Sequence, residues 1–155
     1  MRKRIDFLNY FIQLIIYKLE WTEGLASLIP DTDKHLCMWD FDNCSLKTVI
    51  ESLTPVQNKY NLPDIHIYAD NKENSYRASS PSRLTFNQLL HVLIDTPNID
   101  RHYIEWTLKK GHATIRIGNK AGRNNQNLVY TIINNNNITD YPEKMNFERY
   151  KVIVE

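Results

Sequence analysis

Blocks of apolar residues alternate with polar connectors along this chain, and the spacing inside each block predicts a strand or a helix. Short apolar runs bounded by Gly, Pro, Asn or Asp are typical of strands. The runs of this kind are 35–42, 65–69, 75–79, 113–117, 128–133 and 147–154. Apolar residues repeat at helical spacing in the segments 7–19, 46–53 and 86–93. The pattern therefore predicts an α+β fold.

Capping residues mark where the predicted helices begin. Asn43 or Ser45 can cap the helix that starts near position 46, and Thr85 opens a capping box for the helix that starts at position 86. Proline lacks an amide donor and fits the first turn of a helix. We therefore expect Pro55 to kink the first of these helices or to restart it, with Thr54 as a second cap.

The order of the predicted elements between residues 35 and 117 is strand, helix, strand, strand, helix, strand. This order is typical of a split βαβ, or ferredoxin-like, layout. Such a layout places the helices on one face of an antiparallel-rich sheet and leaves the other face for a site. The later strands would extend the sheet. We expect residues 1–30 to form an N-terminal helix and a connector, and residues 31–155 to form the functional domain.

The N-terminal segment combines a basic start with an apolar stretch, which is also a feature of signal peptides. However, Asp6, Asn9 and Gln13 interrupt the stretch, and no small-residue cleavage site follows. The stretch is also shorter than the roughly 20 apolar residues that span a bilayer. We favour a helix packed on the domain and expect no transmembrane segment. A helix that binds a membrane surface or a partner protein is the alternative.

The composition narrows the class of protein. With 155 residues, of which 42% are hydrophobic and 24% charged, the chain can form one domain with a sizeable core. The formal net charge is only +1, so nucleic-acid binding would depend on a local patch. The cysteines, Cys37 and Cys44, are too few for a disulfide scaffold, so an intracellular, cytoplasmic location is expected. The abundance of Asn, Lys and Ile suggests the AT-rich genome of a virus or plasmid.

Asp40 and Asp42 are the first candidates for chemistry. Alternate residues of a strand share a face, so both carboxylates project to the side opposite Trp39 and Phe41. Neighbouring buried carboxylates repel one another, and a divalent cation such as Mg²⁺ or Mn²⁺ relieves the repulsion. Asp100 would complete a two-metal site for phosphoryl transfer. Alternatively, one acid of the pair caps the next helix while the other is solvated, and Asp100 is a turn or a cap.

Basic and aromatic residues gather in the second half of the chain. Arg77 and Arg116 lie on predicted strands, where a phosphate or a carboxylate is the natural partner. Lys120 and Arg123 lie in a loop rich in Gly, Asn and Gln, which can bind phosphates or be a solvated turn. Further basic residues in this half include Arg83, Arg101, Lys109 and Lys110. The aromatic residues that could stack on bases, or instead pack in the core, are Tyr68, Tyr76, Tyr103 and Trp106.

Several other kinds of site lack their motifs. His35, Cys37 and Cys44 do not have a zinc-binding spacing. The sequence contains no His-x-His pair of a nicking enzyme, no Walker A loop and no Gly-rich dinucleotide fingerprint. The acidic residues therefore remain the main candidates.

In their order and spacing, these motifs resemble the catalytic core of the archaeo-eukaryotic primase family, the primase-polymerases of viruses and plasmids. The segment Met38-Trp-Asp-Phe-Asp42 resembles the first motif of that family. Ser75-Tyr76-Arg77 takes the place of the second motif, Ser-x-His, with Arg where the family has His. Ile99-Asp100 resembles the third motif, and Ile115-Arg-Ile-Gly-Asn-Lys120 resembles a downstream strand that leads to Asn-Lys.

The resemblance, over about residues 35 to 133, implies an RNA-recognition-motif (RRM)-like sheet, a divalent metal and template-directed nucleotide addition. Asp40, Asp42 and Asp100 would be the catalytic residues and would bind Mg²⁺ or Mn²⁺. The metal ions would activate the primer 3′-oxygen and stabilise the pyrophosphate. The residues that would hold the nucleoside triphosphate or the template are Ser75, Arg77, Arg116 and Lys120. Those expected to contact nucleic acid are Lys109, Lys110 and Arg123.

Three functions remain open. The first is a small primase-like DNA nucleotidyltransferase that uses a single-stranded template and nucleoside triphosphates in replication of a virus, phage or plasmid. The second is a catalytically inactive protein of the same fold, which binds nucleic acid or, through its N-terminal helix, a replication partner. In this case Arg77, which cannot act as an acid or base near neutral pH, pairs with Asp40 or Asp42 and replaces the metal. The third is a metal-dependent nuclease.

Overall fold

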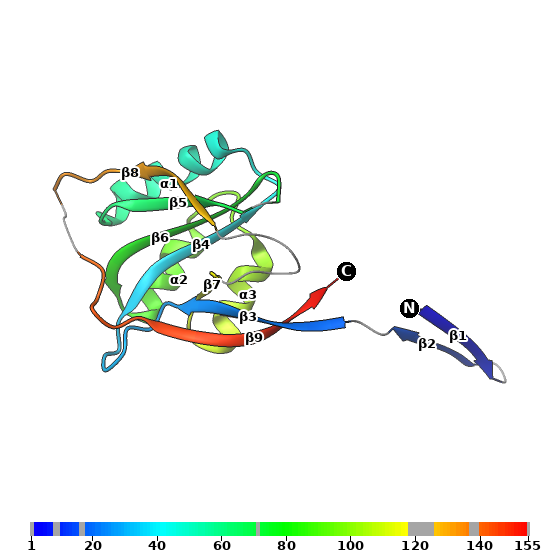
Figure 1. Cartoon of the computed structure of the whole chain (residues 1–155). Helices are drawn as coiled ribbons and strands as arrows, with labels where there is room; N and C mark the ends of the chain where they lie inside the picture. Colours follow the sequence, from blue (N-terminus) through cyan, green and yellow to red (C-terminus); the bar gives the residue numbers. More distant parts are fainter. Residues whose placement is uncertain are drawn as a thin grey trace.

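The chain folds as an α+β structure (Figure 1). This computed structural model describes residues 2–7, 10–15, 18–70, 72–117, 126–136 and 140–154, with side chains described between positions 21 and 150 of these ranges. The strands are β1 Arg2–Phe7, β2 Tyr10–Ile15, β3 Lys18–Ala26, β4 His35–Asp42, β5 Ile65–Ala69, β6 Ser75–Leu84, β7 Thr114–Arg116, β8 Asn127–Ile132 and β9 Asn146–Val154. The helices are α1 Leu46–Tyr60, α2 Phe86–Ile94 and α3 Arg101–Lys110.

The main sheet has the strand order β4-β6-β5-β8, and all its neighbours are antiparallel. The first strand of the predicted unit, β4, thus lies beside the third, β6, which lies beside the second, β5. Strands β5 and β6 form an antiparallel hairpin. By contrast, β7 pairs with β3, and β8 takes the edge beside β5. The α+β prediction is therefore confirmed, and the extra strands are divided between two sheets.

The N-terminal segment forms strands and not the predicted helix. The expected helix over 7–19 is wrong, because β1 and β2 form an antiparallel pair and β3 begins at Lys18. Strand β3 is the middle strand of the order β7-β3-β9. Its pairing with β9 extends over nine residues, from Lys18 to Ala26. The backbone groups that a helix would satisfy are instead paired between β1 and β2 and, from Lys18 on, between β3 and β9.

Helices α1 and α2 begin at predicted capping residues. Ser45 is the N-cap of α1, and Thr85 with Gln88 forms the capping box of α2. Of the two expectations for Pro55, a kink or a restart, the restart is wrong, since α1 continues without a break through Pro55. The Thr54 hydroxyl donates to the Ile50 carbonyl at 2.8 Å and does not cap a new helix. None of the described helices is long and apolar enough to cross a membrane.

The core lies between the main sheet and the helices; in Figure 1, α2 lies behind β4 and β6, and α1 lies at the top beside β5 and β8. Trp39 and Phe41 of β4 are fully buried on this side. The Trp39 indole donates to the Thr96 hydroxyl just beyond α2 at 3.0 Å. Since alternate residues face opposite sides, Asp40 and Asp42 project from the other face of β4, as predicted.

Candidate functional site

The β4–β6 register places an arginine opposite the first acid of the predicted site. Asp40 pairs with Arg77, and Asp42 pairs with Ser75. The Arg77 Nε lies 3.4 Å from the Asp40 Oδ1, and the Arg77 side chain is only 9% exposed. Arg77 thus meets a carboxylate, one of the two partners that the sequence predicts for it.

A third acid, Asp70, completes this cluster from the end of β5. Its Oδ2 lies 3.2 Å from the Arg77 Nη1 and also accepts a hydrogen bond from the Arg116 guanidinium of β7. The side chains of Asp70 and Arg116 are 2% and 7% exposed. Sequence reasoning missed Asp70. The only available signal is that an acid follows β5 directly, at the level where β6 begins. We call Asp40, Asp70, Arg77 and Arg116 the ion-pair cluster.

Asp42 lies nearer the solvent than Asp40. The Ser75 hydroxyl donates to its Oδ1 at 3.0 Å, and the Lys72 Nζ lies 3.6 Å from the same oxygen. The Asp42 side chain is 43% exposed. Ser75, which the resemblance assigns to the nucleotide, therefore contacts an acid of the chain itself.

Asp100 reaches the same end of β4 but serves helix α3. Its backbone N–H donates to the Asp40 carbonyl at 3.1 Å, so the third acid does lie beside the first pair. Its carboxylate caps α3 by accepting from the His102 N–H at 3.1 Å. The capping alternative for Asp100 is therefore the one found. Among the described side chains, no group of three or more His, Cys, Asp or Glu is arranged to hold a metal ion.

Burial and the positive charge of Arg77 have opposite effects on the pKa of Asp40. Burial raises its pKa to about 6, the negative charges of Asp42 and Asp100 add to the rise, and Arg77 opposes it. The Asp40 Oδ1 and the Arg77 Nη1 are both buried without a hydrogen-bond partner among the described residues, although each is within ion-pair distance of an opposite charge. The pair is thus a charge contact without ideal hydrogen-bond geometry.

This arrangement does not fit a divalent cation. A cation bound to Asp40 would lie beside the Arg77 guanidinium, and like charges in a poorly solvated site repel strongly. Arg77 supplies the positive charge that a metal would otherwise supply. The third carboxylate, that of Asp100, is engaged at the start of α3. We derive no chemical step through Mg²⁺ or Mn²⁺ from these residues.

The other basic residues assigned to nucleic acid are distributed over α3 and a loop. The Lys109 ammonium lies 5.1 Å from the centre of the exposed Trp106 ring. The Lys110 ammonium is engaged by Glu148 at 3.0 Å. Lys120 and Arg123 lie outside the described residues. The C-terminal turn of α3 therefore presents one aromatic ring and one adjacent cation.

The predicted stacking residues have separate environments. Tyr103 is buried, and its hydroxyl donates to the Met38 carbonyl at 3.0 Å, so it is a core residue.

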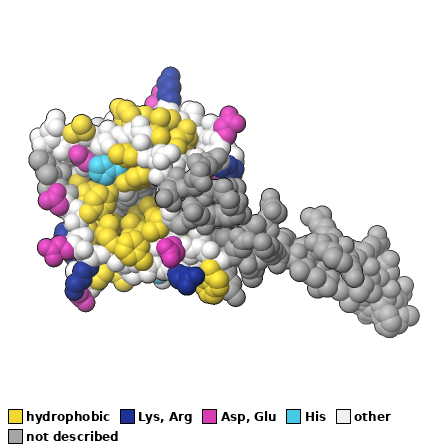
Figure 2. Space-filling model, viewed as in Figure 1, with side chains coloured by type: hydrophobic (Ala, Val, Ile, Leu, Met, Phe, Trp, Pro, Cys, Tyr) yellow, Lys and Arg dark blue, Asp and Glu magenta, His cyan; other side chains and the backbone are white. Residues whose placement is uncertain are grey.

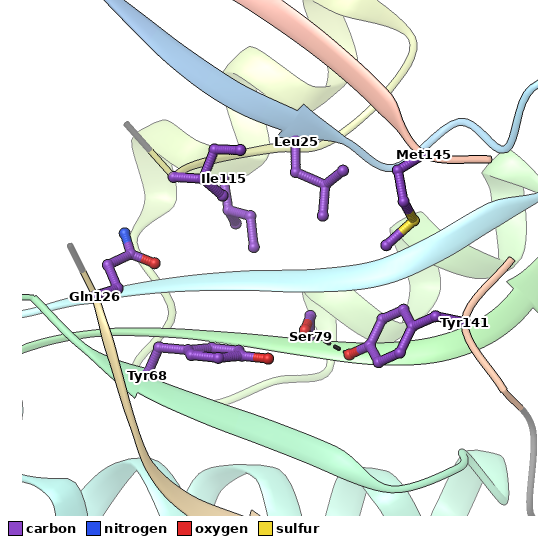
Figure 3. Close-up of a pocket in the computed structure, with 8 residues that line it drawn as sticks. Leu25, Tyr68, Ser79, Ile115, Gln126, Tyr141 and Met145 are labelled. Carbon is purple, nitrogen blue, oxygen red and sulfur yellow. Dashed lines mark hydrogen bonds between the residues drawn. The ribbon is translucent and has the colours of Figure 1, made fainter. Parts of the chain in front are cut away.

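Tyr68 is opposite Arg77 in the β5–β6 register and lines a cavity of about 360 Å³. The residues around this cavity are Leu25, Tyr68, Ser79, Ile115, Ile117, Gln126, Tyr141 and Met145 (Figure 3). Hydrophobic side chains also gather in the middle of the face shown in Figure 2.

Comparisons of the chain with protein-family models, with curated proteins and with solved structures found no match.

Proposed function

We propose that this chain is a catalytically inactive protein of the primase type that binds single-stranded nucleic acid. The observation that carries the proposal is the contact of Arg77 with Asp40 and Asp70, at distances of 3.4 and 3.2 Å. Arg77 stands where the primase motif has a histidine. In this position it neutralises the acids within the chain, so that no metal is needed to do so.

The energetics favour a permanent ion-pair cluster over an exchangeable metal site. Removing one partner from a buried ion pair leaves an uncompensated charge and costs about 3–5 kcal/mol. Displacement of Arg77 by a cation would impose this kind of penalty, because the guanidinium is 9% exposed and would lose both carboxylates. The free energy gained by metal binding would have to exceed that penalty.

Two features support a nucleic-acid ligand. The Trp106 ring is 60% exposed and has the Lys109 ammonium beside it, a combination that can stack on a base and contact a phosphate. The order β4-β6-β5 matches three strands of an RRM-like sheet, a fold that often binds single strands. The proposal includes an RRM-like fold and a replication partner. It also includes an intracellular location, which suits the free thiols of Cys37 and Cys44.

A second candidate is the nucleotidyltransferase. One observation favours it: the hydrogen bond from the Asp100 N–H to the Asp40 carbonyl brings the third acid to the same end of β4 as Asp40 and Asp42. For the three acids to hold a metal together, Arg77 and the Asp100 carboxylate would have to be displaced from their present partners. Metal binding separates the two candidates.

The first experiment measures Mn²⁺ binding by isothermal titration calorimetry. We expect no binding by the wild type and measurable binding by Arg77→His, which restores the residue of the primase motif and opens the acids. The double variant Asp40→Ala/Asp42→Ala added to Arg77→His should lose that binding. Primer synthesis by the wild type with Mn²⁺, abolished by Asp40→Ala/Asp42→Ala, would overturn the proposal in favour of the nucleotidyltransferase. Metal-dependent cleavage of the strand would favour the nuclease instead.

The second experiment measures binding of a fluorescent single-stranded oligonucleotide by anisotropy in the presence of EDTA. We expect metal-independent binding that Trp106→Ala/Lys109→Glu weakens by about tenfold or more, because it removes a stacking ring and a phosphate contact. Lys47→Glu on α1 is the matched control, since it makes the same charge change at an exposed lysine of another helix. Absence of any binding would contradict the proposed function.

A further inference from the structure

We propose that the cavity between the two sheets binds one unpaired base of a single strand. The inference rests on the proposed function and adds to it the chemical group that is recognised. The walls of the cavity come from distant parts of the chain. Leu25 of β3 and Ile115 of β7 lie on one side, and Tyr68 of β5 and Ser79 of β6 lie on the other (Figure 3). The cavity is therefore a product of the packing of the two sheets.

The walls differ in chemistry in a way that suits a flat ring. Leu25, Ile115 and Met145 present aliphatic or thioether groups on one side (Figure 3). Tyr68 and Tyr141 present aromatic rings on the other. A planar heterocycle can stack on an aromatic ring with one face and contact aliphatic groups with the other. Every base has such a face, so this contact does not depend on sequence.

Neutral polar groups line the aromatic side of the cavity. The Ser79 and Tyr141 hydroxyls are hydrogen-bonded at 2.7 Å, and the Tyr141 hydroxyl also interacts with the Tyr68 side chain. Burial raises the pKa of Tyr141 to about 12, so its hydroxyl stays protonated at neutral pH. The Gln126 amide donates to the Arg116 carbonyl through its nitrogen, and its oxygen is a further acceptor. These groups can exchange hydrogen bonds with the edge of a base.

Charge and size restrict the ligand further. None of the eight described lining residues is Lys, Arg, His, Asp or Glu, so the cavity favours a neutral group over a phosphate, a carboxylate or an ammonium. Its volume of about 360 Å³ is at the small end of the range for ligand sites, roughly 300–1,000 Å³. It therefore suits a single base, with the charged backbone of the strand left in the solvent.

The test uses an oligonucleotide that carries one 2-aminopurine, whose fluorescence reports the environment of that base. Tyr68→Ala removes the aromatic wall, and Met145→Trp fills the cavity from the segment before β9. Each should weaken binding by about tenfold, since one stacked base contributes roughly 1–3 kcal/mol. Tyr130→Ala is the matched control, because Tyr130 is an exposed tyrosine of β8 that does not line the cavity. It should leave the affinity and the 2-aminopurine signal unchanged.

The outcomes separate this inference from the proposed function. If both cavity variants remain folded by circular dichroism and bind the oligonucleotide as the wild type does, the base lies elsewhere and the inference fails while the proposed function stands. If the wild type binds no oligonucleotide, the proposed function fails, and titration with 2-aminopurine riboside alone decides the inference. Riboside binding that Met145→Trp abolishes would support the cavity, and no binding would overturn it.

Discussion

Asp40 has a different affinity for protons in the folded and unfolded chain. Its pKa is raised from 3.8 to about 6, mainly by burial, and only in part opposed by Arg77. A carboxyl group with a raised pKa binds protons more tightly in the folded state, so its contribution to stability falls as the pH rises through the window between these two values. The side chain is 25% exposed, so solvent weakens the effect.

The variant Asp40→Asn should therefore change how stability depends on pH. Between pH 4 and pH 7 the wild type should lose on the order of 1–3 kcal/mol relative to Asp40→Asn, because only the wild type must ionise a buried carboxyl group. Urea unfolding of both proteins at several pH values measures this difference. A constant difference across the window would show that Asp40 does not titrate in this way.

At the residue scale, the sequence predicts what a single strand determines and misses what depends on register. The common face of Asp40 and Asp42 follows from the strand period alone. That Arg77 lies opposite Asp40 requires the β4–β6 register, which pairs residues 37 positions apart. Asp70 joins the cluster because β5 ends beside the start of β6, and Arg116 arrives from another sheet. No local sequence pattern predicts these contacts between distant residues.

At the scale of elements, predictions succeed where capping residues decide and fail where strand pairing decides. The helices α1 and α2 begin at their predicted caps because a cap depends on a few neighbouring residues. The N-terminal segment fails because its apolar residues satisfy the helical spacing and are also rich in Ile, Phe and Tyr, which favour strands. Most of the segment lies in β1 and β2, which pair with each other, and only its last two residues belong to β3, which pairs with β9.

Helix α1 offers a prediction at this scale. Pro55 lies inside α1 and cannot donate to the carbonyl one turn earlier, which costs about 3 kcal/mol in a helix interior. Proline also restricts the unfolded chain, which stabilises the fold by only about 0.4–1 kcal/mol. Since the first effect is larger, Pro55→Ala should raise the free energy of unfolding by about 1–2 kcal/mol. Pro97→Ala, in the exposed turn after α2, is the control and should lower it slightly. Urea unfolding measures both, and a decrease for Pro55→Ala would contradict the argument.

At the scale of the whole molecule, the ion-pair cluster connects the two larger sheets. Arg116 belongs to β7 of the three-stranded sheet, whereas Arg77 and Asp40 belong to the four-stranded sheet. Asp70 accepts a hydrogen bond from Arg116 and forms an ion pair with Arg77, so it contacts one arginine of each sheet. The same packing of the sheets creates the cavity lined by Leu25 and Tyr68. A change at Asp70 should therefore affect the stability of the whole fold.

Asp70→Asn should lower the free energy of unfolding by about 3–5 kcal/mol, because two buried guanidinium groups lose a shared counter-charge. A double-mutant cycle with Arg116→Gln isolates the pair, and we expect a coupling energy of about 1–3 kcal/mol. The control cycle uses Lys144 and Asp31, which lie 3.2 Å apart with side chains 76% and 81% exposed. Solvent screens that pair, so its coupling should stay below about 1 kcal/mol. If Asp70→Asn is too unstable to purify, Arg116→Gln alone still tests the cluster through its urea midpoint. Equal coupling in the two cycles would mean that Asp70 and Arg116 behave as a surface pair and do not hold the sheets together.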